Sequence, residues 1–270
     1  MHARAPRGAA TRPSDSPGPV QPSSEPPSMS TEPTRGHTVR AYDHELAQLR
    51  GLVLEMGERV VEQVSDAVTA MVEGIPAPAQ RVIERERKID YFELDVDEDI
   101  FSIIAKRQPA AVDLRLVLAL SKVVGNLERA GDKAEDIAEC ALRLQGREPC
   151  RDTGIFHHVT RLGKMSCCMM ERALDGVART DVDQALDVFA DDSGLADEVA
   201  AAMRHLMSFV VEDPSLLSQV IDMIFAVKAL ERIGNHAGNI AEQVIFVAKG
   251  RDVRYQSREN VIAALRKRDG

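Results

Sequence analysis

The chain has 270 residues, of which 44% are hydrophobic and only 4% aromatic, with no tryptophan. A core built mainly from Leu, Ile, Val, Ala and Met suits packed helices better than a β-sandwich or a β-barrel. The 43 acidic and 34 basic residues give a formal net charge of −9, which argues against a nucleic-acid partner because non-specific binding needs a positive surface.

The cysteines and the apolar runs indicate the compartment. The four cysteines form no CxxC pair and have no His at zinc-finger spacing, so we expect free thiols in a reducing environment. No uncharged apolar run approaches the roughly 20 residues that span a bilayer, and the first residues lack the apolar core of a secretory signal. The sequence therefore predicts a cytoplasmic protein.

Residues 1–38 differ in composition from the rest of the chain. They hold eight of the thirteen prolines together with Ser, Thr and Gly, and they have almost no large apolar side chains. Such a segment cannot bury enough surface to offset the entropy of ordering it. We therefore predict a disordered proline-rich arm.

Three amphipathic helices are predicted in the first half, over 39–148. Apolar residues recur at three- and four-residue spacing from about 41 to 71 and again from about 79 to 106. Pro109 precedes a third such stripe, which Gly146 and Pro149 end. Short turns between long helices predict an antiparallel three-helix bundle.

The second half, over 149–250, repeats this plan. We expect helices over about 154–178 and 181–211, and Pro214 introduces a third that reaches about Lys249. The tail, 251–270, holds six basic and three acidic residues and is expected to be at most weakly helical. The predicted fold is therefore all-α, with two tandem antiparallel three-helix bundles related by internal duplication.

The third helix of each half carries the same motif. Residues 127–139 read LERAGDKAEDIAE and residues 230–242 read LERIGNHAGNIAE, with eight of the thirteen positions identical. Their corresponding places in the two halves favour duplication over coincidence. In the first copy the apolar arc consists of Leu127, Ala130, Ala134, Ile137 and Ala138.

A row of carboxylates lies on another face of this helix. At about 100° per residue, Glu128, Asp132, Asp136 and Glu139 fall within an arc of roughly 80°. Like charges at i, i+4 destabilise a helix by about 0.2–0.5 kcal/mol per pair, so the row needs compensating bases or a cation. Two interpretations stay open at this point: a solvated acidic face, or oxygen ligands for a metal ion.

The motif, in its two copies, resembles the signature of the PhoU family of phosphate-signalling regulators. Residues 107–115 resemble the turn before that family's third helix, and residues 250–254 resemble its ending. The resemblance covers about 40–254. It implies two three-helix bundles with pseudo-twofold symmetry.

The resemblance also implies a function. Members are cytoplasmic, often homodimeric adaptors associated with a phosphate-specific ABC transporter and a sensor histidine kinase. The implied role is that of a negative regulator of the phosphate-starvation response and of phosphate uptake, and not that of an enzyme.

Some family members bind multinuclear iron or zinc clusters on Glu/Asp-x-x-x-Asp motifs, and the resemblance carries this expectation to matching positions here. Glu86-x-x-x-Asp90 on the second helix is expected to contribute to the same face as Glu128 and Asp132. The candidate metal ligands are Asp90, Glu128, Asp132, Asp136, Glu231 and Asn235.

Two departures from the family pattern favour a metal site in the first half. Asn235 stands where the second copy usually has Asp, and a neutral amide oxygen is a weaker ligand than a carboxylate. Asp192 is followed four residues later by Ala196 rather than by an acid. His236 lies beside the second acidic row and is a further candidate ligand.

Two other classes of function compete with the adaptor. A carboxylate-bridged metal-binding or metal-storage protein of the ferritin-like kind would want Glu-x-x-His pairs that project into the bundle centre, and neither acidic row has one. A purely structural helical scaffold is the other alternative. No GxSxG, HExxH or Walker-type phosphate loop is present, which favours a protein without catalytic activity.

Overall fold

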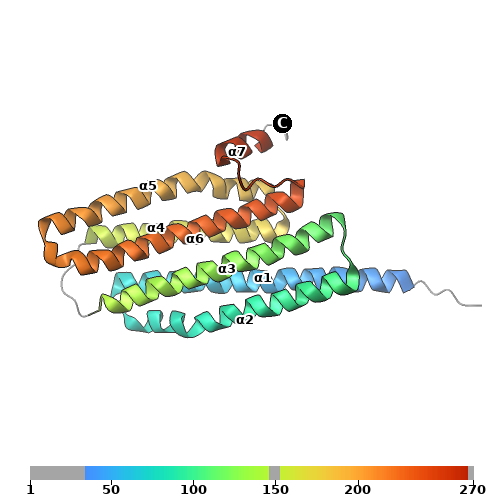
Figure 1. Cartoon of the computed structure of the whole chain (residues 1–270), viewed down its shortest axis with the longest axis horizontal. Coiled ribbons are helices and arrows are strands. Elements are labelled where there is room, and N and C mark those ends of the chain that lie inside the picture. Colours follow the sequence, from blue (N-terminus) through green and yellow to red (C-terminus); the bar gives the residue numbers. More distant parts are fainter. Residues whose placement is uncertain (1–33, 146–152, 267–270) are drawn as a thin grey trace, which may run out of the picture.

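The computed structural model of this protein describes residues 34–145 and 153–266. Within these ranges every regular element is a helix, which confirms the predicted all-α class. Each half contributes three long helices, and one short helix follows them (Figure 1). In chain order the elements are α1 (Thr34–Glu73), α2 (Pro76–Arg107), α3 (Ala111–Arg143), α4 (Thr153–Arg179), α5 (Val182–Glu212), the 3-10 turn η1 (Pro214–Leu216), α6 (Leu217–Lys249) and α7 (Arg258–Arg266).

Glycine and proline end the helices near the predicted positions. Gly74 follows α1 with a φ of +69°, which glycine adopts without steric cost, and Pro76 begins α2. Pro214 begins the 3-10 turn that leads into α6, and Gly250 ends α6 with a φ of +66°. The six long helices predicted from apolar periodicity are therefore all present.

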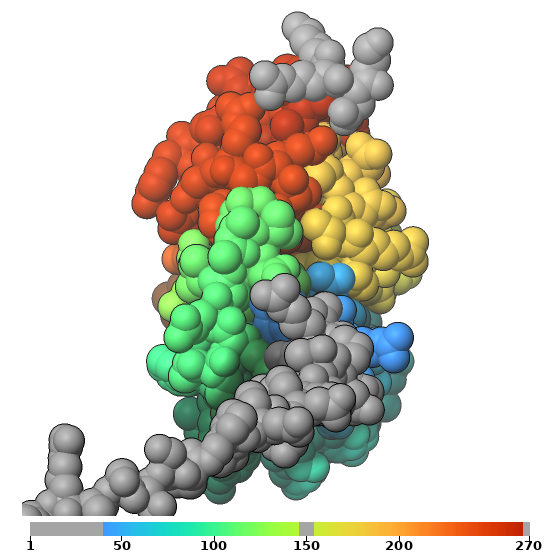
Figure 2. Space-filling view, turned by 90° about the vertical axis from the view of Figure 1, so that its right-hand side faces the viewer, coloured from blue at the N-terminus to red at the C-terminus, as the bar shows by residue number. Residues whose placement is uncertain are grey.

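The two bundles share one hydrophobic core. α3 packs along α6 and α1 packs along α4, whereas α2 and α5 lie at the two outer edges (Figure 1). Since α1 corresponds to α4 and α3 to α6 in the duplication, the contacts between the halves are pseudo-twofold. Figure 2 shows the first half, blue to green, below the second half, yellow to red.

Small residues let α1 and α4 approach closely. A Cβ on Gly163 would lie 2.8 Å from Val68 Cγ2, and a Cβ on Gly57 would lie 2.4 Å from Leu174 Cδ2. Gly57 and Gly163 occupy equivalent positions in the duplication, and so do Val68 and Leu174, because both pairs have the same separation along the chain. The same contact is therefore made twice, with the glycine on α1 in one case and on α4 in the other.

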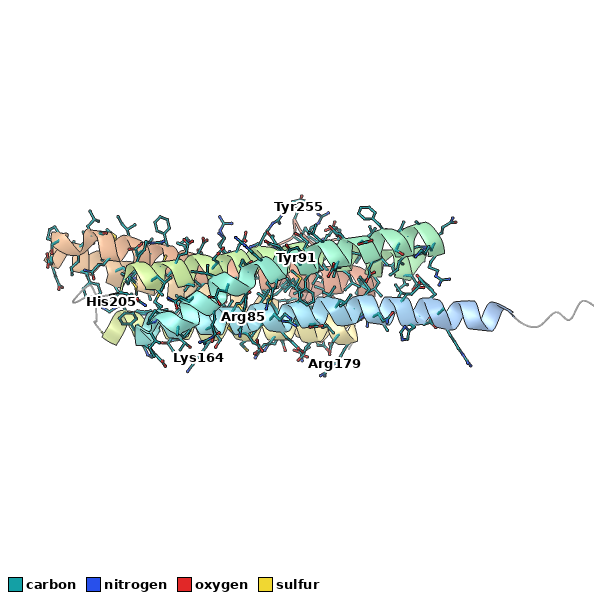
Figure 3. The ribbon with its side chains drawn as sticks, turned by 90° about the horizontal axis from the view of Figure 1, so that it is seen from below. Arg85, Tyr91, Lys164, Arg179, His205 and Tyr255 are labelled. Atoms are coloured by element: carbon teal, nitrogen blue, oxygen red, sulfur yellow. The ribbon has the colours of Figure 1, made fainter. Side chains whose placement is uncertain are left out.

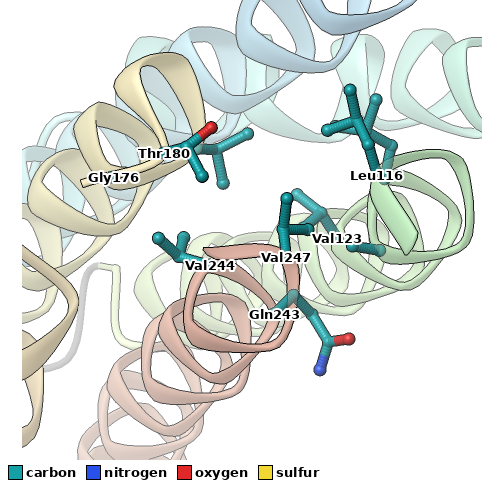
Figure 4. Close-up of a pocket in the computed structure, with 10 residues that line it drawn as sticks. Leu116, Val123, Gly176, Thr180, Gln243, Val244 and Val247 are labelled. Carbon is teal, nitrogen blue, oxygen red and sulfur yellow. The ribbon is translucent and has the colours of Figure 1, made fainter. Parts of the chain in front are cut away.

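A small apolar cavity lies where α3, α4 and α6 meet (Figure 4). Its volume is about 20 Å³, and its lining includes Leu116, Val123 and Val244. The amide of Gln243 points away from the other labelled side chains. A space of this size holds about one water molecule, so the cavity cannot hold a ligand.

The ends of the fold differ from the predictions. α1 begins at Thr34, inside the segment predicted as an arm over 1–38. The helix therefore extends beyond the apolar stripe from which it was predicted. The rest of that arm prediction, and the boundary predicted between 148 and 149, lie outside the described residues. The tail forms α7, which was expected to be at most weakly helical. Burial of Val261 and Leu265, in a helix that contacts α5, explains its formation.

Candidate functional site

The duplicated motif lies on α3 and α6, the two helices at the centre of the molecule. In α3 the predicted apolar arc is fully buried. The equivalent residues of α6 are buried as well. They are Leu230, Ile233, Ala237, Ile240 and Ala241. The motif therefore packs into the core with one face, which leaves its polar face at the seams with neighbouring helices.

Acidic side chains gather at the seam between α2 and α3. The pKa of Glu128 is raised, first by burial and then by the charges of Asp132 and Glu93. Burial and the charge of Asp90 also raise the pKa of Asp132, against the opposing charge of Lys133. These carboxylates therefore lie within electrostatic reach of one another. We call Glu86, Asp90, Glu93, Glu128, Asp132 and Glu135 the acidic cluster.

Glu86 is the most deeply placed member of the acidic cluster. Its side chain is only 5% exposed, and it lies against Gly131, where a Cβ would be 2.9 Å from its Oε1. Gln63 Nε2 donates a hydrogen bond of 3.1 Å to Oε2, but Oε1 has no partner. Burial, followed by the charges of Asp132, Glu135 and Asp90, raises the pKa of Glu86 to about 8.

The acidic cluster fits a cation in charge and in donor chemistry. Its oxygen donors suit hard or borderline metal ions, and the buried Oε1 of Glu86 has an unused lone pair. The side chains do not meet at one point, however, since no three His, Cys, Asp or Glu residues in the described ranges are arranged to hold an ion. Binding would therefore require some of them to change rotamer.

The structure distributes the predicted ligands unequally. Asp90, Glu128 and Asp132 belong to the acidic cluster. Asp136 is exposed at its edge and accepts a hydrogen bond of 2.5 Å from Lys133 Nζ. In the second half, Glu231 forms an ion pair with Lys228, one turn earlier on the same helix, and Asn235 is half-buried.

In the described part of the second half, Glu86 has no counterpart. Gly234, the equivalent of Gly131, faces Leu195 and Met169, with a Cβ position 2.3 Å from Leu195 Cδ2. An apolar pair therefore fills the place that Gln63 and Glu86 occupy in the first half.

Two carboxylates of α5, Asp192 and Glu198, are paired with bases. Asp192 forms an ion pair with Arg258 of α7. Glu198 is bound by His158 Nδ1 at 2.6 Å and by Arg161 Nε at 3.1 Å. Unlike the acidic cluster, these carboxylates have their charge partners within the chain.

The predicted ligands do not include three members of the acidic cluster, Glu86, Glu93 and Glu135. Glu86 belongs to the Glu-x-x-x-Asp motif of the second helix, whereas Glu93 and Glu135 belong to no predicted metal-binding motif. Glu135 follows Glu128 by seven residues, which places it on the same helix face, and Glu93 follows Asp90 by three. The spacing signal was present, but the depth of Glu86 depends on how α2 packs on α3.

His236 on α6 contacts Asn126 on α3 and so links the two halves. Its Nδ1 lies 3.0 Å from Asn126 Oδ1, which also accepts a hydrogen bond of 3.0 Å from Asn239 Nδ2. Burial, followed by the charges of Arg129 and Arg232, lowers the pKa of His236 to about 4, so the ring is neutral at pH 7. The contact with Asn126 gives this histidine a role in packing α6 against α3.

The fold and the site together define an internally duplicated helical protein with a cluster of carboxylates at a helix seam. Among the described residues, no helix combines the length and the apolar content that crossing a bilayer requires. A model of the PhoU domain matches residues 53–141 and 159–244. The chain belongs to the PhoU family, a family of accessory and regulatory proteins rather than enzymes, which confirms both the resemblance and the expectation of a non-enzyme.

Individual relatives support this assignment. The chain is 40% identical to the phosphate-specific transport system accessory protein PhoU homolog of Pseudomonas putida, over 85% of this chain and 89% of that protein. It is 36% identical to the corresponding Escherichia coli protein, over 81% and 90%.

Two crystal structures have the same fold. PhoU from Pseudomonas aeruginosa superposes with a TM-score of 0.74 at 40% identity, over 78% of this chain and all (100%) of that one. The phosphate transport system regulatory protein PhoU from Streptococcus pneumoniae has a TM-score of 0.72 at 22% identity, over 78% and 99%, and shows the fold alone.

Proposed function

We propose that this protein is a cytoplasmic adaptor that restrains the phosphate-starvation response and phosphate uptake. In this role it connects a phosphate-specific ABC transporter with a sensor histidine kinase. The observation that carries the proposal is the similarity, over most of the chain, to accessory proteins of phosphate-specific transport. Homologues that align over almost their whole length are good candidates for a shared role.

Exposed apolar side chains offer two docking surfaces for such an adaptor. Leu114 and Leu118 are exposed on α3, and Leu217 and Ile221 are exposed at the equivalent positions of α6. Contiguous exposed apolar residues are typical of protein–protein contact sites. The α2–α3 and α5–α6 connections, beside which these residues lie, are at opposite ends of the molecule (Figure 1). Two partners, or one partner and a second copy in a homodimer, can therefore bind at the same time.

Deletion of the gene tests the regulatory role. We expect phosphate-starvation genes to be expressed in high phosphate in the deletion strain, and the wild-type gene to restore repression. Leu118→Lys and Ile221→Lys should each fail to restore it at normal protein levels, because a buried lysine would disrupt an apolar contact. Arg204→Lys, an exposed change that keeps the charge, serves as the control. Unchanged expression in the deletion strain would exclude the regulatory role for this gene.

We further propose that the acidic cluster binds iron or zinc and that the second half contributes little. The unpartnered Glu86 Oε1 supports a first-half site. The ion pair of Glu231 with Lys228 and the neutral Asn235 argue against an equal second site. The chemistry that a metal would supply is cross-linking of α2 to α3 through carboxylates.

The metal content of single variants tests whether the site lies in the first half. Glu128→Ala and Asp132→Ala should each reduce the affinity for metal by roughly tenfold or more, whereas Glu231→Ala should have little effect. Elemental analysis after equilibrium dialysis against iron(II) or zinc measures the bound metal. Equal losses in the three variants would contradict a first-half site, and no bound metal in the wild type would exclude it.

The alternative function is a carboxylate-bridged metal-binding or metal-storage protein, and the same acidic cluster favours it. A ferritin-like centre lies inside its bundle, however, whereas here Glu128, Asp132 and Glu135 are only half-buried at a seam. An oxygen-consumption assay of the iron-loaded protein separates the two functions. Turnover would favour the metalloprotein over the adaptor.

A further inference from the structure

A second surface feature lies apart from the apolar ends, in the groove between α3 and α6. Its volume is about 760 Å³, which is in the range of sites for nucleotide-sized ligands. Both copies of the duplicated motif line it, since it lies between the C-terminal half of α3 and the N-terminal half of α6. Its basic residues are Arg129, Lys133, Arg143, Lys228, Arg232 and His236.

The groove is positive although the whole chain is acidic. Five Lys and Arg side chains face it, against the carboxylates of Asp132 and Asp136, whereas the chain carries a net charge of −9. Ion pairs neutralise Lys133 with Asp136, Arg143 with Asp222 and Lys228 with Glu231. The positive charge that remains belongs to Arg129 and Arg232, and it exceeds the negative charge of Asp132. A concave surface with an excess of one charge concentrates ions of the opposite sign.

Two of these bases form no short ion pair, although the charge of Arg129 acts on Glu93 and Glu128 at longer range. Arg143 binds Asp222, and Lys228 binds Glu231. In the described part of the chain, neither Arg129 nor Arg232 forms an ion pair within 4.0 Å. The two arginines occupy the same position in the two copies of the motif, so the pseudo-twofold packing brings one guanidinium from each helix to the groove.

The lowered pKa of His236, which lines the groove, is consistent with a positive potential there. His236 is held by Asn126, and it stays uncharged because burial and the charges of Arg129, Arg232 and Lys133 lower its pKa. Phe225, which is 60% exposed, lies on the same lining and offers an aromatic face. The groove therefore combines planar cationic donors with a surface on which a base can stack.

We propose that this groove binds a small anion with two or more phosphate groups, with Arg129 and Arg232 as its main ligands. Guanidinium groups bind phosphate oxygens through paired hydrogen bonds, and two of them on opposite walls suit an anion with more than one phosphate. The phosphates can belong to free pyrophosphate or to a nucleoside diphosphate. Binding of such an anion does not depend on the regulatory role proposed above. The groove proposal and the regulatory proposal can therefore fail independently.

Isothermal titration calorimetry of the full chain with pyrophosphate and with ADP tests the site. We expect one site per chain, with an affinity that falls as salt is raised. Arg129→Gln together with Arg232→Gln should weaken binding by about a hundredfold, since each charge-assisted contact contributes about tenfold. The control is Arg179→Gln together with Arg204→Gln, which makes the same change in net charge. Arg179 and Arg204 are exposed on α4 and α5, and neither lines the groove. Figure 3 shows Arg179 at the edge of the molecule.

The outcomes are distinct. Equal binding of pyrophosphate and ADP would identify the phosphate groups as the whole determinant. Tighter binding of ADP that is lost in Phe225→Ala would identify a nucleotide site. Both outcomes support the groove. No binding of either compound at low salt would overturn the proposal, as would equal weakening in the two double variants. Binding of only an acidic or phosphorylated protein segment would likewise overturn it.

Discussion

Replacement of Glu86 by Gln is expected to stabilise the metal-free protein by about 4 kcal/mol at pH 8 and by under about 1 kcal/mol at pH 5. Glu86 is nearly fully buried and has one oxygen without a hydrogen-bond partner. Glutamine keeps the shape of the side chain, and its oxygen can still accept the hydrogen bond from Gln63. It removes the negative charge that burial and the neighbouring acids make costly.

The direction of the pH dependence follows from the pKa of Glu86. In the folded protein it is raised to about 8 by burial and by Asp132, Glu135 and Asp90, above its ordinary value of 4.5. Between these values the folded state binds more protons than the unfolded state, so stability falls as pH rises. The stability linked to the protonated Glu86 is fully present below about pH 4.5, and it is lost as pH rises through about 8.

Urea unfolding followed by circular dichroism, in buffers with a chelator, measures both effects. The double variant Gln63→Met, Glu86→Leu introduces the residue types of the apolar pair Met169 and Leu195 in the second half. It should also stabilise the protein at pH 8. Glu198→Gln is the matched control, because Glu198 is equally buried but is bound by His158 and Arg161. It should destabilise the protein, because it leaves two bases without their carboxylate. If Glu86→Gln is no more stabilising at pH 8 than at pH 5, Glu86 is not held protonated.

Helix number and class could be predicted because their causes are local. Gly74, Pro109 and Pro214 interrupt stripes with a period near 3.6, and interruption and period are both visible in the residues themselves. α7 could not be predicted in this way. An isolated helix of nine residues is marginal in water, and this one forms because Val261 and Leu265 are buried by tertiary packing.

The candidate sites were only partly accessible from the sequence. The acidic row on α3 could be found from i, i+4 spacing, but its partner residues on α2 depend on the register between the two helices. That register places Glu86 against Gly131, and no local pattern shows it. The pairing of Arg129 with Arg232 across a groove likewise depends on the way in which α3 packs along α6. Duplication indicated that the arginines are equivalent, whereas only the structure shows that both reach one surface.

The close approach of α1 and α4 leads to the second large effect. Gly163→Ala is expected to destabilise the protein by about 2 kcal/mol, although Ala in place of Gly in a helix interior normally stabilises by up to about 1 kcal/mol. The new Cβ would lie 2.8 and 3.1 Å from the two γ-carbons of Val68. A β-branched side chain cannot rotate both γ-carbons away, so the helices must separate.

Thermal unfolding of a double-mutant cycle measures this contact directly. In a Val68→Ala background the γ-carbons are gone, so Gly163→Ala should become neutral or stabilising. Gly51→Ala is the control for helix propensity, because Gly51 has no other atom within 4 Å of its Cβ position and should gain up to about 1 kcal/mol. Gly57→Ala should cost less than Gly163→Ala, since the end of the flexible Leu174 side chain can move aside. Additive effects of Val68→Ala and Gly163→Ala would show that the α1–α4 interface does not depend on this glycine.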